Sequence, residues 1–157
     1  MKEYKVALFG HRDFCASKEI EERLYFILRD LIRTKEFVKI YIGRNGEFDV
    51  FAASIIRRVK DAFGGDNSEM TLVLPYCVRD VEYYEQYYDC ISIPIEKTHY
   101  KGAIEKRNKW MVEKCNLLIC YVNRTSGGAY AALQYANKLG KRVINLAAGK
   151  SESSKMY

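Results

Sequence analysis

Short apolar runs alternate with longer amphipathic segments along most of the chain. The apolar runs predict buried β-strands at residues 4–9, 38–42, 70–74, 91–95, 117–122 and 143–146. Apolar positions three or four residues apart predict helices at residues 17–34, 49–63, 81–88, 101–114 and 129–139. Strands that alternate with helices in this way pack as a parallel sheet covered on both faces. We therefore expect an α/β, Rossmann-like three-layer sandwich with a mostly parallel sheet of about five to six strands.

Length and composition are those of one globular domain. The chain has 157 residues, of which 48% are hydrophobic and 29% charged, enough for a single core. We expect this domain to cover residues 1–148 and a flexible tail to cover residues 149–157. No apolar run is long enough for a bilayer and no secretion signal opens the chain, so we expect a cytoplasmic protein without membrane contact.

The 5 cysteines are odd in number and never form a CxxC pair, which fits a reducing compartment. His11 and His99 are far apart, so we expect no metal site and no cofactor. The net charge is +6, but lysines and arginines are interspersed with acidic residues, as in residues 18–23. Without a dense basic run, we expect a small anionic ligand as the partner in preference to nucleic acid.

Three strand-to-helix junctions carry the candidate chemistry, because parallel α/β sheets bind ligands beyond the carboxyl ends of their strands. The first junction is Gly10, His11 and Arg12. An arginine can hold a phosphate through two hydrogen bonds, and a histidine can donate or accept a proton near neutral pH. The alternative is a turn glycine followed by solvated side chains.

The second junction is a glycine loop formed by Gly43, Arg44, Asn45 and Gly46. Two glycines before a helix expose backbone amides that can bind a phosphate or a ribose. Asp49 follows and could instead cap the helix. A carboxylate at Glu47 would repel phosphate, so it would be aimed at a ribose hydroxyl or a glycosidic carbon. Glu47 and Asp49 are the candidate catalytic residues.

The third junction follows the most apolar strand and gives the strongest indication of a ligand site. A hydroxyl and a glycine pair open the next helix and offer free amides to an anion; the alternative is an ordinary loop and cap. The residues of this junction are Ser126, Gly127, Gly128, Ala129 and Tyr130.

Two further features lie inside helices. Arg107 and Asn108 fall on the apolar face of their helix, where a charge needs a partner, either a ligand phosphate, backbone carbonyls of the glycine loops or an internal salt bridge. Tyrosines at 83, 84, 87 and 88 form two pairs four residues apart, on adjacent helix faces. One of these faces is a candidate for base stacking or for a homodimer contact.

Taken together, these motifs resemble the SLOG superfamily, the Rossmann-like group that includes the LONELY GUY phosphoribohydrolases and the DprA-like proteins. The resemblance is closest to small stand-alone bacterial or phage members and covers nearly the whole chain. It implies a nucleotide or nucleotide-derived ligand bound across the glycine loops, and a homodimer or higher oligomer. The motifs are Gly10-His11-Arg12, residues 43–49, residues 107–111 and residues 126–130.

The sequence departs from the enzymes of that superfamily, whose PGGxGTxxE motif ends in a catalytic glutamate. Aligning the glycine pair with Gly127 and Gly128 puts Gln134 at that position, and Gln cannot act as a carboxylate base. We therefore expect a protein that senses or sequesters an ADP-ribose-type or cyclic nucleotide signal without strong catalysis. One alternative is an N-glycosidase (phosphoribohydrolase) acting on nucleoside 5′-monophosphates through Glu47 or Asp49. A second is a DprA-like single-stranded DNA-binding module.

Overall fold

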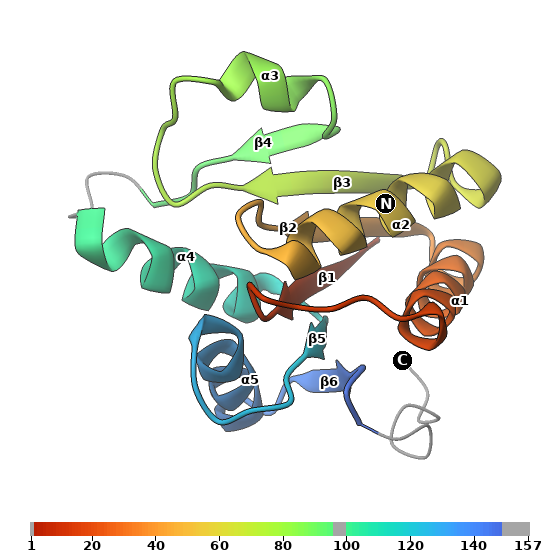
Figure 1. The fold of residues 1–157 in the computed structure, drawn as a ribbon. Coiled ribbons are helices and arrows are strands. Elements are labelled where there is room, and N and C mark those ends of the chain that lie inside the picture. Colours follow the sequence, from red (N-terminus) through yellow and green to blue (C-terminus); the bar gives the residue numbers. More distant parts are fainter. Residues whose placement is uncertain (1, 96–99, 149–157) are drawn as a thin grey trace.

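The computed structural model describes residues 2–95 and 100–148, which form a single six-stranded parallel sheet with helices on both faces (Figure 1). The predicted α/β, Rossmann-like architecture is therefore confirmed, whereas the predicted tail at residues 149–157 lies outside the described residues. The strands are β1 (Glu3–Gly10), β2 (Phe37–Ile42), β3 (Ser68–Val73), β4 (Cys90–Ser92), β5 (Leu117–Tyr121) and β6 (Arg142–Asn145). The helices are α1 (Lys18–Thr34), α2 (Glu47–Phe63), α3 (Val81–Glu85), α4 (Tyr100–Lys114) and α5 (Gly128–Lys138).

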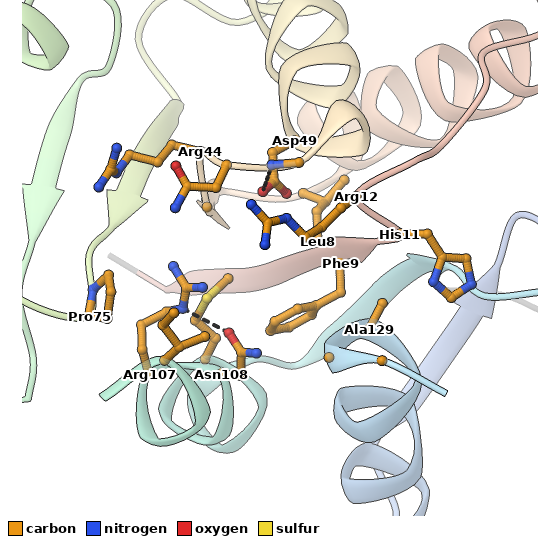
Figure 2. A pocket seen from close by; sticks show the side chains of 18 of the residues that line it. Leu8, Phe9, His11, Arg12, Arg44, Asp49, Pro75, Arg107, Asn108 and Ala129 are labelled. Atoms are coloured by element: carbon orange, nitrogen blue, oxygen red, sulfur yellow. Dashed lines mark hydrogen bonds between the residues drawn. The ribbon is translucent and has the colours of Figure 1, made fainter. Parts of the chain in front are cut away.

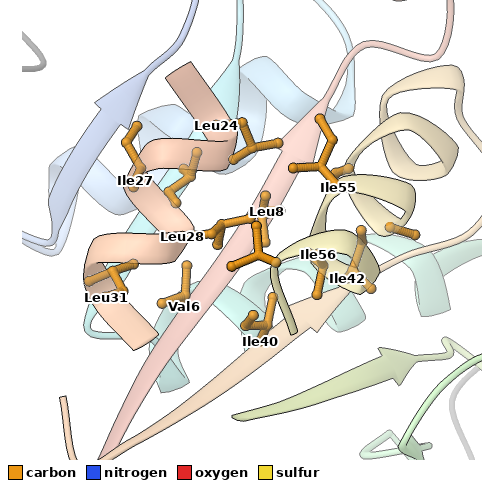
Figure 3. Packing of buried hydrophobic residues seen from close by; sticks show 14 of the residues in the cluster. Val6, Leu8, Leu24, Ile27, Leu28, Leu31, Ile40, Ile42, Ile55 and Ile56 are labelled. Atoms are coloured by element: carbon orange, nitrogen blue, oxygen red, sulfur yellow. The ribbon is translucent and has the colours of Figure 1, made fainter. Parts of the chain in front are cut away.

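Helices α1 and α2 cover one face of the sheet, and α4 and α5 cover the other. Alternate side chains of a strand point to opposite faces, so Val6 and Leu8 of β1 pack under α1 and α2 (Figure 3). Their neighbours Ala7 and Phe9 belong to the second core, together with Met111 of α4. Burial on both faces explains why the strands read as continuous apolar runs.

The strand order β4-β3-β2-β1-β5-β6 places a topological switch point between β1 and β5. The chain builds outward from β1 to β4 and then returns to add β5 on the other side of β1. Gly10, the last residue of β1, lies beside Tyr121, the last residue of β5. The loops that follow β1 and β5 therefore start side by side and run to opposite faces of the sheet. Sheets of this kind bind ligands in the crevice between two such loops.

One predicted helix start is wrong, because α2 begins at Glu47 and its N-cap residue is Gly46. Asp49 caps this helix from its third position, where its Oδ2 accepts the Gly46 N–H at 3.3 Å. A carboxylate at the third position of a helix accepts the N–H of the N-cap residue, whereas an N-cap side chain accepts the N–H of the second or third helical residue. Acidic residues are common both at the N-cap and at the third helical position, so the residue type alone does not show which of these two positions Asp49 occupies.

The segment after β3 also differs from its prediction. Helix α3 ends at Glu85 instead of Tyr88, and β4 ends at Ser92 instead of Ile95. Asp89 explains the early turn into β4, because its carboxylate accepts the Met70 N–H and pairs with Lys60, both at 2.7 Å. These contacts fix the chain beside β3 before another helical turn can form. Among the described residues, no helix is long and apolar enough to cross a membrane.

Candidate functional site

A pocket of about 360 Å³ lies at the carboxyl ends of the central strands (Figure 2). It lies beside the switch point, between the N-termini of α2 and α5 and one face of α4. Among the predicted binding residues, Ser126 and Tyr130 are not part of its lining. The predicted binding residues that line it are Gly10, His11, Arg12, Gly43, Arg44, Asn45, Gly46, Arg107, Asn108, Gly127, Gly128 and Ala129.

The two candidate catalytic residues lie in different surroundings. Glu47 is exposed and does not line the pocket, and its backbone N–H donates to the Arg12 carbonyl at 2.9 Å. Asp49 does line the pocket and is partly buried. Burial raises the pKa of Asp49, while the Gly46 amide and the charge of Arg107 act in the opposite direction. Within the described residues, Asp49 is the only carboxylate in the pocket lining.

His11 connects the first junction to the third. Its side chain is buried, and its Nε2 accepts the backbone N–H of Asn123 at 3.1 Å. Burial lowers the pKa of His11 below its usual value, and the positive charge of Arg124 lowers it further. A neutral ring that accepts at Nε2 carries its proton on Nδ1, so His11 positions the third junction as well as lining the pocket.

Two glycines allow the first two junctions to approach closely. A Cβ atom on Gly10 would lie 2.0 Å from Cγ of Phe48, a fully buried residue of α2. A Cβ atom on Gly46 would lie 3.1 Å from Cα of Arg12. Hydrogen atoms at these positions let the start of α2 pack directly against the end of β1. The Gly10 position is therefore required by packing, independently of any ligand.

Arg107 reaches across the pocket from α4, as predicted from its place on the apolar face. Its Nη1 donates to the Val73 carbonyl and its Nε to Oδ1 of Asn108, each at 2.8 Å. The accepting carbonyl belongs to the end of β3 and not to a glycine loop, which corrects that expectation. Burial lowers the pKa of Arg107, and the negative charge of Asp49 opposes this effect. A Cβ on Gly43 would lie within 3.3 Å of both of these side chains.

Arg44 is held by a tyrosine that the sequence alone did not connect with the pocket. Its Nη1 donates to the Tyr84 hydroxyl at 3.0 Å, and its guanidinium lies 5.2 Å from the centre of the Tyr84 ring. The Nε atom of Arg44 is buried and has no hydrogen-bond partner among residues 2–95 and 100–148. The spacing of the tyrosine pairs indicated two faces, and the structure shows that Tyr84 faces Arg44 while Tyr83 and Tyr87 are exposed.

The third junction presents an open helix N-terminus. Gly127 has a φ of +94°, which favours glycine, and α5 begins at the next residue. The first amides of a helix have no partner within it, so they face the pocket as anion donors. At the rim, Arg124 forms two hydrogen bonds of 2.9 and 2.8 Å with Asp13. These bonds hold the pKa of Asp13 below its usual value. Nothing in the sequence pattern singled out Asp13.

The charged groups and helix N-termini around the pocket can hold an anion. Arg12 and Arg107 project into it (Figure 2), Arg44 lines it while its guanidinium turns towards Tyr84, and two helix N-termini add their amides and dipoles. No group of three or more metal-ligating side chains occurs within residues 2–95 and 100–148.

No family model matches the sequence, and a search of the curated proteins found no match. Solved structures do match. DNA processing protein A (DprA) from Streptococcus pneumoniae gives a TM-score of 0.62 at 15% identity, over 89% of this chain and 49% of that one. The chain has a DprA-like fold. The predicted DprA-like fold is thus confirmed.

Two other solved structures extend this comparison. DprA from Helicobacter pylori, described for its single-stranded DNA binding mode, gives a TM-score of 0.60 at 15% identity, over 89% of this chain and 63% of that one. The molybdenum cofactor carrier protein of Chlamydomonas reinhardtii gives 0.54 at 14% identity, over 97% and 82%. This chain therefore spans less than two thirds of either DprA chain. The comparisons do not support the expectation of a small ligand in preference to nucleic acid.

Proposed function

We propose that the pocket binds a nucleotide-derived small molecule, such as an ADP-ribose-type or cyclic nucleotide signal, and that the protein senses or sequesters it. The observation that carries this proposal is that Arg12, Arg44 and Arg107 meet the N-terminus of α5 in one pocket at the switch point. Each of these groups favours a phosphate, and together they fit a ligand with more than one negative charge.

The state of these cationic groups supports the proposal. Within the described residues, the Arg12 guanidinium has no hydrogen bond or ion pair, so it can engage a ligand without breaking an internal contact. The buried Nε of Arg44 gains a partner if a phosphate oxygen reaches it. The pocket volume of about 360 Å³ is within the usual range for small-ligand sites.

The carboxylates favour binding over catalysis. Gln134, which replaces the expected glutamate, is exposed on α5, and Glu47 lies outside the pocket lining. Asp49 already accepts a hydrogen bond from the Gly46 amide. At the position of Gln134, where the LONELY GUY enzymes have their catalytic glutamate, this chain therefore has no carboxylate.

A charge inserted at the N-terminus of α5 tests the proposal. Gly128→Asp is compatible with the backbone, since its φ is not positive and the nearest atom to a Cβ there is Nδ2 of Asn108 at 3.6 Å. An aspartate in the first turn also favours the helix, so the variant should fold. Isothermal calorimetry with AMP, ADP-ribose, cyclic ADP-ribose and NAD should show at least a tenfold loss of affinity for the ligand that wild type binds.

The isosteric Gly128→Asn supplies the same side-chain volume without the charge, so the difference between the two variants reports electrostatic repulsion alone. If wild type binds none of the four ligands, or if the two variants bind equally, the proposal is wrong. Mass spectrometry of small molecules that copurify with wild type would identify the ligand directly.

A second candidate function, N-glycosidase activity on nucleoside 5′-monophosphates, is favoured by the position of Asp49 alone. This carboxylate lines the pocket, and its raised pKa is suited to proton transfer. Asp49→Asn distinguishes the two functions, since the amide keeps an oxygen for the Gly46 N–H. Chromatography would show loss of base release if Asp49 is catalytic. If the site only binds, AMP stays intact with wild type and the variant binds it more tightly.

Single-stranded DNA is a third candidate, supported by the DprA-like fold and the net charge of +6. Gel shifts with an oligonucleotide at two salt concentrations test it, since phosphate contacts weaken steeply with salt. Salt-sensitive binding that is lost in Gly128→Asp would place DNA in the same pocket. Binding of nucleotides without any gel shift would exclude this candidate.

We also propose that the chain forms a homo-oligomer through the exposed tyrosine pair beside β4. The side chains of Tyr83 and Tyr87 are 55% and 46% exposed, with ring centres 5.2 Å apart. Exposed tyrosines of this kind are enriched at interfaces. Sedimentation of the Tyr83→Ser/Tyr87→Ser variant should give a smaller species than wild type, and an unchanged species would contradict the proposal.

A further inference from the structure

A second hollow lies between α4 and α5, beside the pocket described above. Its volume is about 520 Å³, and four of its lining residues, Ile104, Asn108, Gly127 and Gly128, also line the first pocket. We call it the α4–α5 groove. The first turn of α5 is therefore a common wall, with the anion site on one side and the groove on the other.

The groove is lined mainly by apolar groups. Ala131 and Ala132 of α5 and Val112 of α4 contribute small side chains, which leave space between the two helices. Ile104 adds a large apolar side chain that is 46% exposed. Tyr135 also lines the groove, and the Lys109 ammonium lies 5.6 Å from the centre of its ring. Apolar walls with one aromatic ring suit a flat, weakly polar group.

The wall between the two hollows carries little side-chain bulk. A Cβ atom on Gly127 would meet nothing within 4 Å, and one on Gly128 would be near only Nδ2 of Asn108. The Oδ1 atom of Asn108 accepts from Arg107, so this side chain is oriented with its amide nitrogen towards Gly128. A ligand can therefore extend from the first pocket into the groove across Gly127 and Gly128, where the amide nitrogen of Asn108 can donate to it.

We propose that the α4–α5 groove takes the flat heteroaromatic base of the nucleotide whose phosphate lies at the first turn of α5. The inference deepens the proposed function and rests on it. A phosphate at Gly127 and Gly128 places the rest of the molecule within reach of both hollows. Within the part of the chain that the structure describes, arginines line the first pocket and none lines the groove. Among the same residues, the one carboxylate of the groove lining is Glu105, which is paired with Lys109 at 3.5 Å.

The proposal predicts that the base contributes to affinity through the groove. Calorimetry with AMP and ribose 5-phosphate compares two ligands that share the phosphate and ribose and differ in the base. Wild type should bind AMP at least tenfold more tightly. Ala131→Met fills the groove from an exposed helical position and should lower AMP affinity to that of ribose 5-phosphate, with ribose 5-phosphate binding unchanged within twofold.

Asn137→Met is the matched control, because Asn137 is exposed on α5 and lines neither hollow. It should bind both ligands as wild type does. Equal binding of AMP and ribose 5-phosphate by wild type would overturn the groove proposal and leave the proposed function standing. Absence of binding for both ligands would overturn the groove proposal, and the proposed function fails with it only if ADP-ribose, cyclic ADP-ribose and NAD do not bind either.

Two further results would also overturn the proposal. One is an equal loss of affinity for AMP and for ribose 5-phosphate in Ala131→Met. The other is a change in sedimentation caused by Ala131→Met and not by Asn137→Met, which would make the groove a contact between copies of the chain.

Discussion

The Nε2 atom of His11 accepts the backbone N–H of Asn123 at 3.1 Å, so the residue that follows β1 holds the start of the loop that leads into α5. The two residues are 112 positions apart in the sequence. Their contact aligns the glycine pair of α5 with the arginines across the pocket. Three charged or titratable neighbours face this ring or its loop: Arg124, Asp13 and Tyr121.

The burial of His11 makes the stability of the protein dependent on pH. The pKa of His11 in the folded chain is below the usual 6.5, so the unfolded chain takes up the proton first as the pH falls. The stabilisation is complete above 6.5 and is lost as the pH falls from there through the folded-state pKa. Denaturant unfolding at about pH 7.5 and about pH 5.5 should show a larger loss of stability for wild type than for His11→Gln.

The Gln side chain can still accept the Asn123 N–H but does not titrate. The difference between wild type and His11→Gln therefore gives the part of the unfolding free energy that depends on protonation of His11. His11→Ala removes the acceptor and should cost about 1–3 kcal/mol at neutral pH. Identical pH dependence of wild type and His11→Gln would contradict the prediction, since it would show that folding does not lower the pKa of His11.

Gly10→Ala should destabilise the fold, because the added Cβ would overlap the Phe48 ring. Overpacking of this kind costs about 1–3 kcal/mol. Gly65→Ala is the matched control, since a Cβ there meets nothing within 4 Å, and its stability should change by less than about 0.5 kcal/mol. Equal midpoints for the two variants in urea would contradict the packing argument.

Arg107→Met should weaken nucleotide binding tenfold or more. A hydrogen bond from a charged group contributes about 1.5–3 kcal/mol, and 1.4 kcal/mol corresponds to a factor of ten. The variant should also be less stable, because the Val73 carbonyl loses its donor and Asp49 its nearby cation. Calorimetry on protein checked for folding by circular dichroism measures the effect. Lys106→Met, one position earlier and exposed, should bind as wild type does.

Asp13→Asn should strengthen anion binding. It breaks the ion pair with Arg124, which lines the pocket, and makes that guanidinium available to a ligand. Both side chains are largely exposed, so stability should change by less than about 1 kcal/mol. Calorimetry should show a several-fold gain for the ligand that wild type binds, and Arg124→Gln should show a loss. A weaker or unchanged affinity in Asp13→Asn would mean that Arg124 only holds the loop through its bonds to Asp13 and does not bind the ligand.

The sequence predicted the sheet and the glycine junctions because both depend on local patterns. A buried parallel strand is a continuous apolar run, and a junction follows directly from the end of a strand. Arg107 was also detectable, since a charge on an apolar helix face needs a partner. Its actual acceptor, the Val73 carbonyl, comes from a different strand end, and no local pattern specifies which one.

Other features depend on contacts between distant residues. The Phe48 ring over Gly10, the Tyr84 hydroxyl on Arg44 and the Asp13 carboxylate on Arg124 each join separate elements. The outward position of Glu47 follows from α2 beginning two residues before Asp49, and residue type alone does not settle that boundary. Sequence patterns predicted the junctions that surround the pocket, and contacts between distant elements determine which side chains of those junctions line it.

The strand order also has a consequence for synthesis on the ribosome. Strands β1 to β4 pair in the order in which they emerge, so these four strands of the six-stranded sheet can assemble as soon as residue 92 is available. This assembly lacks α4, the loop after β5 and the first turn of α5, all of which form part of the pocket. A ligand in the cell would therefore stabilise only the finished chain, by mass action, and give the nascent chain no assistance.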